Sequence, residues 1–290
     1  MAGIIDLIGN TPLVQLSRLN VNPNVKVYAK LEGNNPGGSV KDRAALYMIR
    51  NAIALGEIKP GTRLIEATSG NTGIALAMIA RLYDLEIELV MPSNSTRERV
   101  LTMTAFGAQV TLLDNMEVCR DYATEKGATD GYYLLDQFAN PNNYLAHYQT
   151  TGPEIWRDTD GQITHFVSAM GTTGTIMGCS KFLKEQNSAI QIVGCQPAED
   201  ASIPGIRRWP AAYLPKIFDP KRVDLLVDIA ETDAVQTARE LAKVEGIFAG
   251  MSTGGAGYAA LKLAATLNSG VIVFIACDRG DRYLSSDLFG

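Results

Sequence analysis

The sequence predicts an α/β fold of two domains, each a mostly parallel twisted sheet flanked by helices. Short apolar runs alternate with longer segments in which apolar residues recur every three or four positions, the periods of strands and helices. Loops of small residues at 68–73 and 171–175 each stand between a predicted strand and a predicted helix. The run 271–276 is nearly all apolar, as expected for a central parallel strand buried on both faces.

The first half of the chain begins with an extended piece and a predicted strand at 25–31. A helix is expected to begin near Ser39, because a serine hydroxyl can accept a hydrogen bond from a backbone N–H of the first turn, and to end at Gly56. The alternation then continues with strands at 63–67, 86–91 and 109–113 and helices at 73–83, 96–106 and 117–126.

The second half of the chain repeats the same alternation. Its predicted elements are strands at 165–170, 190–195 and 271–276 and helices at 175–185, 234–245 and 254–267. No repeat, low-complexity tract or long Gly/Ser linker separates the halves, so composition by itself marks no domain boundary.

Composition is that of an ordinary globular enzyme. The chain has 290 residues, 46% hydrophobic and 20% charged, which is enough for one large core or for two closely packed domains. Lys and Arg number 26 against 31 Asp and Glu, a net charge of −5, and no basic stripe with interleaved aromatic residues appears. A nucleic-acid partner is therefore not expected.

Cysteine usage and the N-terminus predict a cytoplasmic protein. The four cysteines lie far apart with no paired spacing, which favours reduced thiols over a disulfide framework or a zinc site; they are Cys119, Cys179, Cys195 and Cys277. The first residues lack a basic region followed by an apolar stretch, and no run of about 18 apolar residues occurs, so no membrane segment is expected. His147 and His165 fall in no metal-binding spacing and are interpreted as packing residues.

Lys41 is the most informative residue of the first half. It lies in the run PGGSVKDR, a turn that leads into a helix. A helix start is electropositive, so a partly desolvated lysine there loses some preference for its charged form and becomes a better nucleophile. Such an amine can form a Schiff base, although a solvated surface lysine is the alternative. The two small-residue loops that follow favour the catalytic interpretation.

The loop 171–175 has the ingredients of a phosphate cradle. It offers successive backbone N–H groups, three threonine hydroxyls and the N-terminus of a helix; its residues are Gly171, Thr172, Thr173, Gly174 and Thr175. A plain strand-to-helix turn is the alternative. The chain lacks both the Gly-x-Gly-x-x-Gly pattern and the Gly-Lys-Ser/Thr of a P-loop, so nicotinamide and ATP chemistry are disfavoured.

The loop 68–73 has the same physical character. Its backbone donors and the hydroxyls of Ser69 and Thr72, at the start of a helix, can bind a carboxylate. Asn71 lies in this loop and Gln137 in the run DQF. By themselves, Asn71 could be only a turn residue and Gln137 only a surface amide.

Seven segments carry a resemblance to a known family: PGGSVKDRA, EATSGNTGIALAM, DQFANP, TGPEIW, GTTGT, SIPGIRRWP and CDRGDRYLS. Together they resemble the fold type II pyridoxal phosphate enzymes, which share the tryptophan synthase β-like fold, and within them the B-form cysteine synthases, or O-acetylserine sulfhydrylases. The resemblance runs from the residues IGNTPL at 8–13 almost to the C-terminus. The first three motifs are shared by the wider group, whereas SIPGIRRWP and CDRGDRYLS point to the B form.

The resemblance implies a cofactor, a domain division and site residues. It implies pyridoxal 5'-phosphate on Lys41, with its phosphate in the loop 171–175 and its 3-oxygen on Asn71. The substrate carboxylate would bind the loop residues Thr68, Ser69, Gly70 and Thr72, with Gln137 also in contact with substrate. The N-terminal domain would be 36–150, the C-terminal domain 1–35 plus 151–290, and the protein a homodimer.

Two residues are candidates for the hydrogen-bond partner of the pyridine nitrogen of the cofactor. A neutral hydroxyl or thiol there makes the ring a weaker electron sink than an acid would, which suits β-elimination. Ser252, in the run GMSTGG, is the first candidate, although it could also cap the following helix, and Cys277 is the second. Arg207 and Arg208 follow a Pro-Gly turn and by themselves could simply be solvated. The resemblance implies that this segment borders the active-site entrance, where a guanidinium could attract an anionic sulfur donor such as thiosulfate.

The expected reaction is a β-replacement that forms L-cysteine from O-acetyl-L-serine and sulfide, and S-sulfocysteine from thiosulfate. Lys41 would serve as covalent anchor and general base. A lyase or dehydratase acting on serine or threonine, or a synthase that prefers O-phosphoserine, stays open, because one sequence does not fix the leaving group. An anion-binding module without covalent chemistry is the alternative outside the enzymes.

Overall fold

The computed structural model describes residues 3–68 and 70–290 and divides into two compact units. Unit 1 comprises Met1–Ile8 and Lys41–Asn143, and unit 2 comprises Gly9–Val40 and Tyr144–Gly290. This contact-based partition differs from the predicted domains at residues 1–8, 36–40 and 144–150. The predicted domains, 36–150 and 1–35 plus 151–290, stay a prediction.

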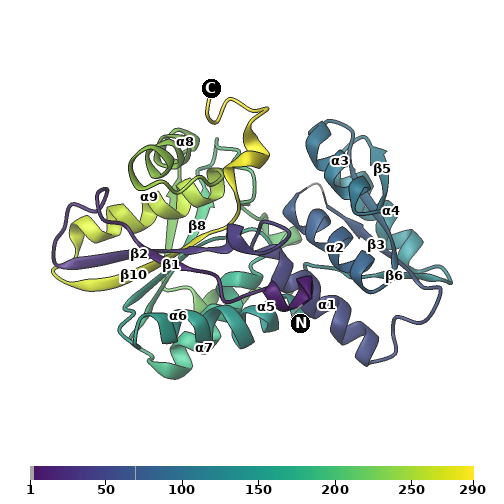
Figure 1. Cartoon of the computed structure of the whole chain (residues 1–290), viewed down its shortest axis with the longest axis horizontal. Coiled ribbons are helices and arrows are strands. Elements are labelled where there is room, and N and C mark those ends of the chain that lie inside the picture. Colours follow the sequence, from purple (N-terminus) through teal and green to yellow (C-terminus); the bar gives the residue numbers. More distant parts are fainter. Residues whose placement is uncertain (1–2, 69) are drawn as a thin grey trace. The chain divides into compact units, whose positions relative to one another are not determined.

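Unit 1 is built on a four-stranded parallel sheet in the order β5-β4-β3-β6 (Figure 1). The strands are β3 (Arg63–Ala67), β4 (Glu86–Pro92), β5 (Gln109–Leu113) and β6 (Tyr132–Leu134), and the helices are α1 (Lys41–Ala54), α2 (Asn71–Leu82), α3 (Arg97–Ala105) and α4 (Met116–Gly127). Alternate residues of β3 face opposite sides: Leu64 packs with the core that includes α1 and α2, whereas Ile65 packs against Cys119 of α4.

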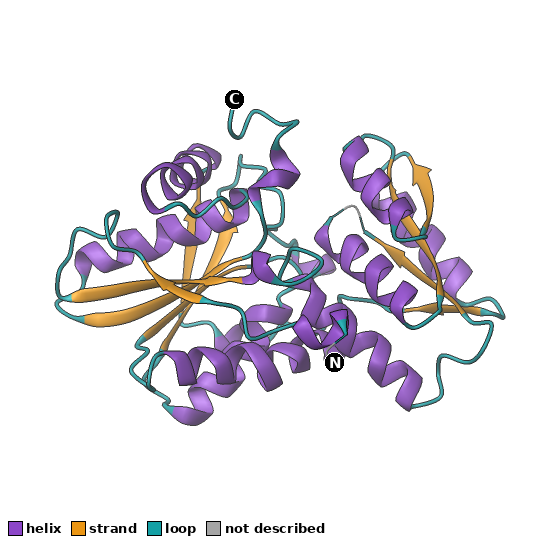
Figure 2. Cartoon of the chain, in the orientation of Figure 1, coloured by secondary structure: helices purple, strands orange, loops and turns teal. Residues whose placement is uncertain are grey.

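Unit 2 is built on a six-stranded sheet in the order β1-β2-β10-β7-β8-β9, with only β1 antiparallel among the described strands. Its strands are β1 (Leu13–Gln15), β2 (Val25–Leu31), β7 (His165–Ala169), β8 (Gln191–Pro197), β9 (Leu225–Ile229) and β10 (Gly270–Ala276). The sheet is drawn in orange in Figure 2.

Helices cover both faces of the unit 2 sheet. Phe274 of β10 packs in the core that includes α8 (Glu231–Glu240) and α9 (Met251–Thr266), whereas Val273 packs in the core that includes α6 (Gly152–Asp158) and α7 (Gly174–Gln186). Helix α5 (Pro141–Ala146) spans the boundary of the two units. The short helical turns are η1 (Ile4–Leu7), η2 (Glu32–Asn34), η3 (His147–Thr151), η4 (Ala211–Tyr213), η5 (Pro220–Arg222), η6 (Leu241–Glu245) and η7 (Gly280–Tyr283).

The predicted fold class is confirmed. The apolar strand β10 lies between β2 and β7, in the centre of its sheet. Gly56 ends the first helix with a positive φ of 71°, a conformation that glycine adopts without steric cost. Helix α1 begins at Lys41, two residues after Ser39, and Ser39 forms an isolated β-bridge with Asp278; the role of Ser39 as the cap of this helix stays a prediction.

A buried ion cluster ties β2 to α6 within unit 2. The ammonium of Lys30 is fully buried, 2.9 Å from Oε2 of Glu154 and 3.2 Å from Oδ2 of Asp158. It also donates to the carbonyl oxygen of Thr11 at 2.6 Å. A buried charge requires such pairing, because an unpaired one would carry the full cost of desolvation. Among the helices of the described residues, none is long and apolar enough to cross a membrane.

Candidate active site

The loop after β7 lies where parallel α/β sheets bind ligands, at the carboxyl end of a central strand. Residues Thr172, Thr173 and Thr175 are buried, and Thr173 is the N-cap of α7. Thr173 adopts a left-handed conformation with φ of 70°, uncommon for a β-branched residue. In the described part of the chain, its Oγ1 is buried without a hydrogen-bond partner.

A strained residue with an unpartnered hydroxyl, at the electropositive end of a 13-residue helix, fits an anion. The predicted loop differs in one detail: α7 begins at Gly174, so Gly174 and Thr175 belong to its first turn. The donor set therefore matches what a phosphate ester requires, namely neutral hydroxyls and backbone N–H groups at a helix N-terminus.

The SIPGIRRW segment packs directly against this loop. A Cβ atom on Gly171 would lie 2.9 Å from the carbonyl oxygen of Gly205, so only glycine fits there. The indole Nε1 of Trp209 donates to the carbonyl oxygen of Gly171 at 2.7 Å, and the backbone N–H of Arg207 donates to that of Met170 at 2.8 Å. The structure thus brings two distant sequence motifs together within unit 2.

The two arginines of that segment differ in their contacts. Arg208 donates to the carbonyl oxygen of Pro197 at 2.9 Å and pairs with Asp228 of β9 at 2.5 Å. Arg207 is exposed. The guanidinium of Arg208 is therefore already engaged within its own unit.

Ser252 lies in the first turn of α9, and the residue at the N-cap is Gly250, so the interpretation of Ser252 as a helix cap is wrong. Ser252 is buried, and a Cβ atom on Gly205 would lie 3.4 Å from its Oγ. Cys277 follows β10, and its backbone N–H donates to Oγ1 of Thr253 at 2.9 Å. Both candidates for the ring-nitrogen partner thus lie in unit 2, on adjoining segments.

His147 contacts the phosphate-type loop, which sequence reasoning missed. Its Nε2 lies 3.3 Å from Oγ1 of Thr175, and its Nδ1 lies 2.8 Å from Oγ1 of Thr151. His147 is buried, so the interpretation as a packing residue is confirmed, but its position beside Thr175 had no signal in the sequence. His165 is half-buried, and burial lowers its pKa.

In unit 1, the predicted lysine and the predicted substrate loop stand at helix starts. Lys41 is the first residue of α1, and Asn71 is the first residue of α2, with Gly70 at its N-cap. Thr68 is buried, and its backbone N–H donates to the carbonyl oxygen of Val90 at 2.9 Å. Ser69 lies outside the described residues.

Gln137 joins this loop from the segment after β6. Its Oε1 accepts a hydrogen bond from the Thr72 hydroxyl at 2.9 Å, and both side chains are buried. The carbonyl oxygen of Gln137 accepts from Nδ2 of Asn143 at 2.7 Å, which holds the backbone of the segment. The interpretation of Gln137 as a surface amide is therefore wrong.

The buried carboxyl group of Glu66 contacts the side chain of Gln137. Glu66 lies on β3, two residues before Thr68, and its Oε1 accepts from Nε2 of Gln137 at 3.4 Å. Burial, and then the charge of Asp136, raise its pKa to about 8, although hydrogen bonds from Gln137 and Asp136 oppose the rise. Sequence reasoning missed this residue because an acidic residue in a short apolar strand gives no spacing signal.

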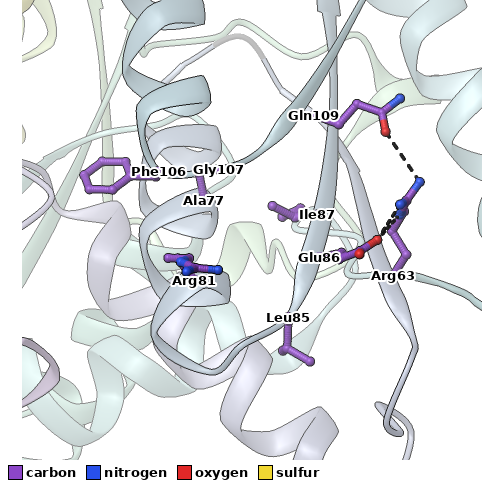
Figure 3. A pocket seen from close by; sticks show the side chains of 9 residues that line it. All are labelled: Arg63, Ala77, Arg81, Leu85, Glu86, Ile87, Phe106, Gly107 and Gln109. Carbon is purple, nitrogen blue, oxygen red and sulfur yellow. Dashed lines mark hydrogen bonds and ion pairs between the residues drawn. The ribbon is translucent and has the colours of Figure 1, made fainter.

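A separate surface pocket of about 270 Å³ lies at the other end of the unit 1 strands (Figure 3). Arg63, Glu86 and Gln109, the first residues of β3, β4 and β5, line it together with Arg81 near the end of α2. Arg63 pairs with Glu86, so the charge of this wall is largely neutralised. The carboxyl ends of the same strands, where Thr68 and Gln137 lie, form the opposite edge of the sheet.

Comparison with known proteins agrees with the site. The family model described as "Pyridoxal-phosphate dependent enzyme" matches residues 4–278. Cysteine synthase B of Salmonella typhimurium is 58% identical over 98% of this chain and 94% of the relative, and that of Pseudomonas aeruginosa is 57% identical over 99% and 97%. A crystal structure of O-acetyl serine sulfhydrylase isoform 3 from Entamoeba histolytica superposes with a TM-score of 0.94 at 38% identity, covering 100% of this chain and 91% of that one.

Proposed function

Because the chain belongs to the family of pyridoxal-phosphate dependent enzymes, we propose that it is a cysteine synthase that forms L-cysteine from O-acetyl-L-serine and sulfide. The identity of 57% or more to two proteins named cysteine synthase B supports this reaction. The observation on the structure that carries the proposal is the left-handed Thr173 with its buried, unpartnered hydroxyl at the start of α7. Such a loop is built to receive an anion such as the cofactor phosphate.

The cofactor phosphate would be held by the loop 171–175. The backbone N–H groups of the first turn of α7, and the hydroxyls of Thr172, Thr173 and Thr175, are the donors that we assign to it, with Gly171 and Gly174 allowing close approach of the backbone. An anion in the loop would give the buried Thr173 hydroxyl a hydrogen-bond partner, which makes binding more favourable. Nε2 of His147 contacts the hydroxyl of Thr175 and helps to fix its position.

Lys41 is assigned two tasks. Its Nζ would hold the cofactor and would carry the substrate Cα proton away and back. The bound cofactor supplies an electron sink that allows the Cα–H and Cβ–O bonds of the substrate to break. The position of Lys41 as the first residue of α1 supports this assignment, because the positive end of the helix dipole favours the neutral amine.

The substrate carboxylate is assigned to the loop at the start of α2. Thr68, Gly70, Thr72 and Gln137, together with Ser69, would bind it, and Asn71 would hold the cofactor 3-oxygen. The hydroxyl of Thr72 donates to Oε1 of Gln137 and so sets these two side chains side by side before any substrate arrives. The backbone N–H of Thr72 and an N–H of the Gln137 amide are then the donors that we assign to the carboxylate. Preorganised donors of this kind bind an anion without a further cost in ordering.

A neutral group is assigned to the ring nitrogen of the cofactor. Ser252 is the first candidate because it is buried and lies near Gly205, which in turn lies against Gly171. Cys277 is the alternative, since its segment is hydrogen-bonded to Thr253, the neighbour of Ser252. Replacing each by alanine and following the visible spectrum of the bound cofactor would decide between them.

Thiosulfate is proposed as a second sulfur donor, yielding S-sulfocysteine. Of the two arginines, Arg207 is the better candidate to attract it, because Arg208 is already paired with Asp228. Arg207→Ala should lower the rate with thiosulfate about tenfold more than the rate with sulfide, on the order of 1–2 kcal/mol for a charge-assisted hydrogen bond. Arg208→Ala is the matched control, and equal slowing with both donors would contradict the assignment of Arg207.

We further propose a homodimer in the cytoplasm. The four cysteines, of which Cys119, Cys179 and Cys195 are buried, suit a reducing compartment as thiols. The dimer follows the resemblance to the cysteine synthases, and light scattering of the purified protein would test it.

The decisive experiment is spectroscopic and analytical. The purified protein should show a visible absorption band from bound pyridoxal phosphate that changes on addition of O-acetyl-L-serine, and L-cysteine should then form on addition of sulfide. Formation of pyruvate or a keto acid without cysteine would instead identify a lyase or dehydratase. Absence of the visible band in protein reconstituted with the cofactor would leave an anion-binding module and overturn the proposal.

A further inference from the structure

A hydrogen-bonded chain of three buried side chains leads from the interior of unit 1 to the substrate loop. Glu66 on β3 accepts from the amide of Gln137 at 3.4 Å, and that amide accepts from the Thr72 hydroxyl at 2.9 Å. The three residues are 2%, 4% and 6% exposed, so water does not compete freely for their hydrogen bonds. Glu66 and Gln137 lie 71 positions apart in the sequence, and two hydrogen bonds connect the three side chains.

We propose that Glu66 is a positioning residue for the substrate carboxylate: its buried carboxyl group orients the Gln137 amide, which holds the Thr72 hydroxyl in the loop at the start of α2. This inference rests on the proposed function of that loop. Glu66 does not itself touch substrate in the proposal; it acts through Gln137.

The orientation of the Gln137 amide is the property that Glu66 controls. With Nε2 directed to Glu66 and Oε1 directed to Thr72, the two ends of the amide are distinguished. The backbone N–H groups of Gln137 and Asp136 also act on the carboxyl group of Glu66, and Asn143 holds the backbone of Gln137 by a separate hydrogen bond. A change at Glu66 that keeps its shape and an acceptor oxygen, such as Glu66→Gln, should therefore alter binding at the loop while the contact with Asn143 still holds the segment that carries Gln137.

The charge of Glu66 adds a second consequence. In the neutral state the carboxyl group can hold Gln137 without placing a negative charge behind an anion-binding loop. Once ionised, it would repel the substrate carboxylate across a buried, weakly screened distance. The substrate loop should thus lose affinity for its anion as Glu66 loses its proton.

Neutral residues adjoin Glu66 on the neighbouring strand and at the start of α2. The neighbouring strand β4 brings the apolar Leu89 into register with it, and α2 begins with the neutral Asn71 and Thr72. Asp136, in the segment after β6, is the charged group whose field raises the pKa of Glu66. Lys126 of α4 is engaged with a different carboxylate, that of Glu88.

The test is the pH profile of KM for O-acetyl-L-serine, measured with the holoenzyme of the wild type and of Glu66→Gln. With a pKa of about 8, wild-type KM should rise about tenfold between pH 7 and pH 9 relative to that of Glu66→Gln, while kcat changes little. The ratio of the two KM values cancels the ionisation of the substrate itself. Glu66→Gln keeps the shape and a partner for Gln137 but cannot ionise.

Glu88→Gln is the matched control. Glu88 is an equally buried carboxyl group on the neighbouring strand, but it binds Lys126, Thr111 and Tyr122 instead of Gln137. Its variant should keep the wild-type dependence of KM on pH. If it instead flattened the profile as Glu66→Gln does, the effect would belong to the sheet in general, and the proposal would be overturned.

Two further outcomes decide the matter. Superimposable KM profiles of wild type and Glu66→Gln would overturn the role of Glu66, whereas a wild type that forms no cysteine at pH 7 would overturn the proposed function instead. Should Glu66→Gln fail to fold, Glu66→Asp, which withdraws the carboxyl group by one methylene, replaces it. A KM raised severalfold at pH 7 in Glu66→Asp, with kcat largely kept, supports the positioning role, and an unchanged KM overturns it.

Discussion

The buried carboxyl group of Glu66 should make the stability of the protein fall as pH rises. In the folded state burial, and then the charge of Asp136, raise its pKa from 4.5 to about 8. Between pH 4.5 and about pH 8, the folded protein therefore keeps a proton on Glu66 that the unfolded chain has already lost. The stabilisation is complete below pH 4.5, is lost progressively up to about pH 8, and changes no further above that.

The magnitude follows from the width of that window. A difference of about 3.5 pKa units at about 1.4 kcal/mol each gives on the order of 5 kcal/mol as an upper bound. Glu66→Gln should remove this loss of stability at high pH, because an amide of the same size cannot ionise. The variant should then be more stable than the wild type by several kcal/mol at pH 9, and the difference should shrink to near zero or reverse at pH 5.

Urea unfolding of the wild-type and Glu66→Gln holoenzymes at pH 5, 7 and 9 measures this difference. Glu88→Gln provides a control of the opposite sign: burial raises the pKa of Glu88, but hydrogen bonds from Lys126, Thr111 and Tyr122 outweigh it and lower the pKa. That carboxylate stabilises the fold above the unfolded pKa and less as pH falls, so its variant should be destabilised most at neutral pH. Parallel stability curves for wild type and Glu66→Gln across the pH range would refute the reasoning.

Three further predictions concern single residues. Lys41→Ala should leave a folded protein that forms no cysteine; near-normal turnover would exclude Lys41 as anchor and base. Thr173→Val removes the buried hydroxyl at the start of α7, and the affinity for pyridoxal phosphate should fall roughly tenfold or more, by titration of the apoprotein; unchanged affinity would count against the loop. Lys30→Met leaves Glu154 buried without its cation, and thermal unfolding should show a loss of about 3–5 kcal/mol, with recovery in the double variant Lys30→Met/Glu154→Leu. A single variant as stable as the wild type would show that this cluster contributes little.

Local sequence patterns predicted most of the long elements. Strands such as β3 and β5 have the predicted bounds, 63–67 and 109–113, because β-branched and apolar residues there stand between clear turn signals. Strand β1 was predicted only as part of an extended piece, and two further strands, β6 and β9, were missed. Strand β6 is only three residues long, and β9 is an edge strand with Leu225 and Leu226 exposed, so neither has the alternation that a half-buried strand shows.

Helix boundaries show the same limit. Helix α2 begins at Asn71 and α7 at Gly174, each slightly earlier than the predicted 73 and 175. The α7 start depends on Thr173 adopting a left-handed conformation, which no propensity of threonine favours. The loop that contains Thr173 packs against the SIPGIRRW segment, where the indole of Trp209 donates to the carbonyl oxygen of Gly171, a contact between distant positions that local propensity does not encode.

By itself, the sequence determined the α/β class, the central place of β10, and the small-residue loops at helix starts, because these depend on residue types close together in the chain. Tertiary structure alone decided which distant side chains meet. The order β5-β4-β3-β6 brings the segment after β6 beside the end of β3, and so places Gln137 between Glu66 and Thr72. Strand order is set by packing and chain crossovers rather than by local periodicity, so a buried acid in an apolar strand becomes informative only once its neighbours across the sheet are known.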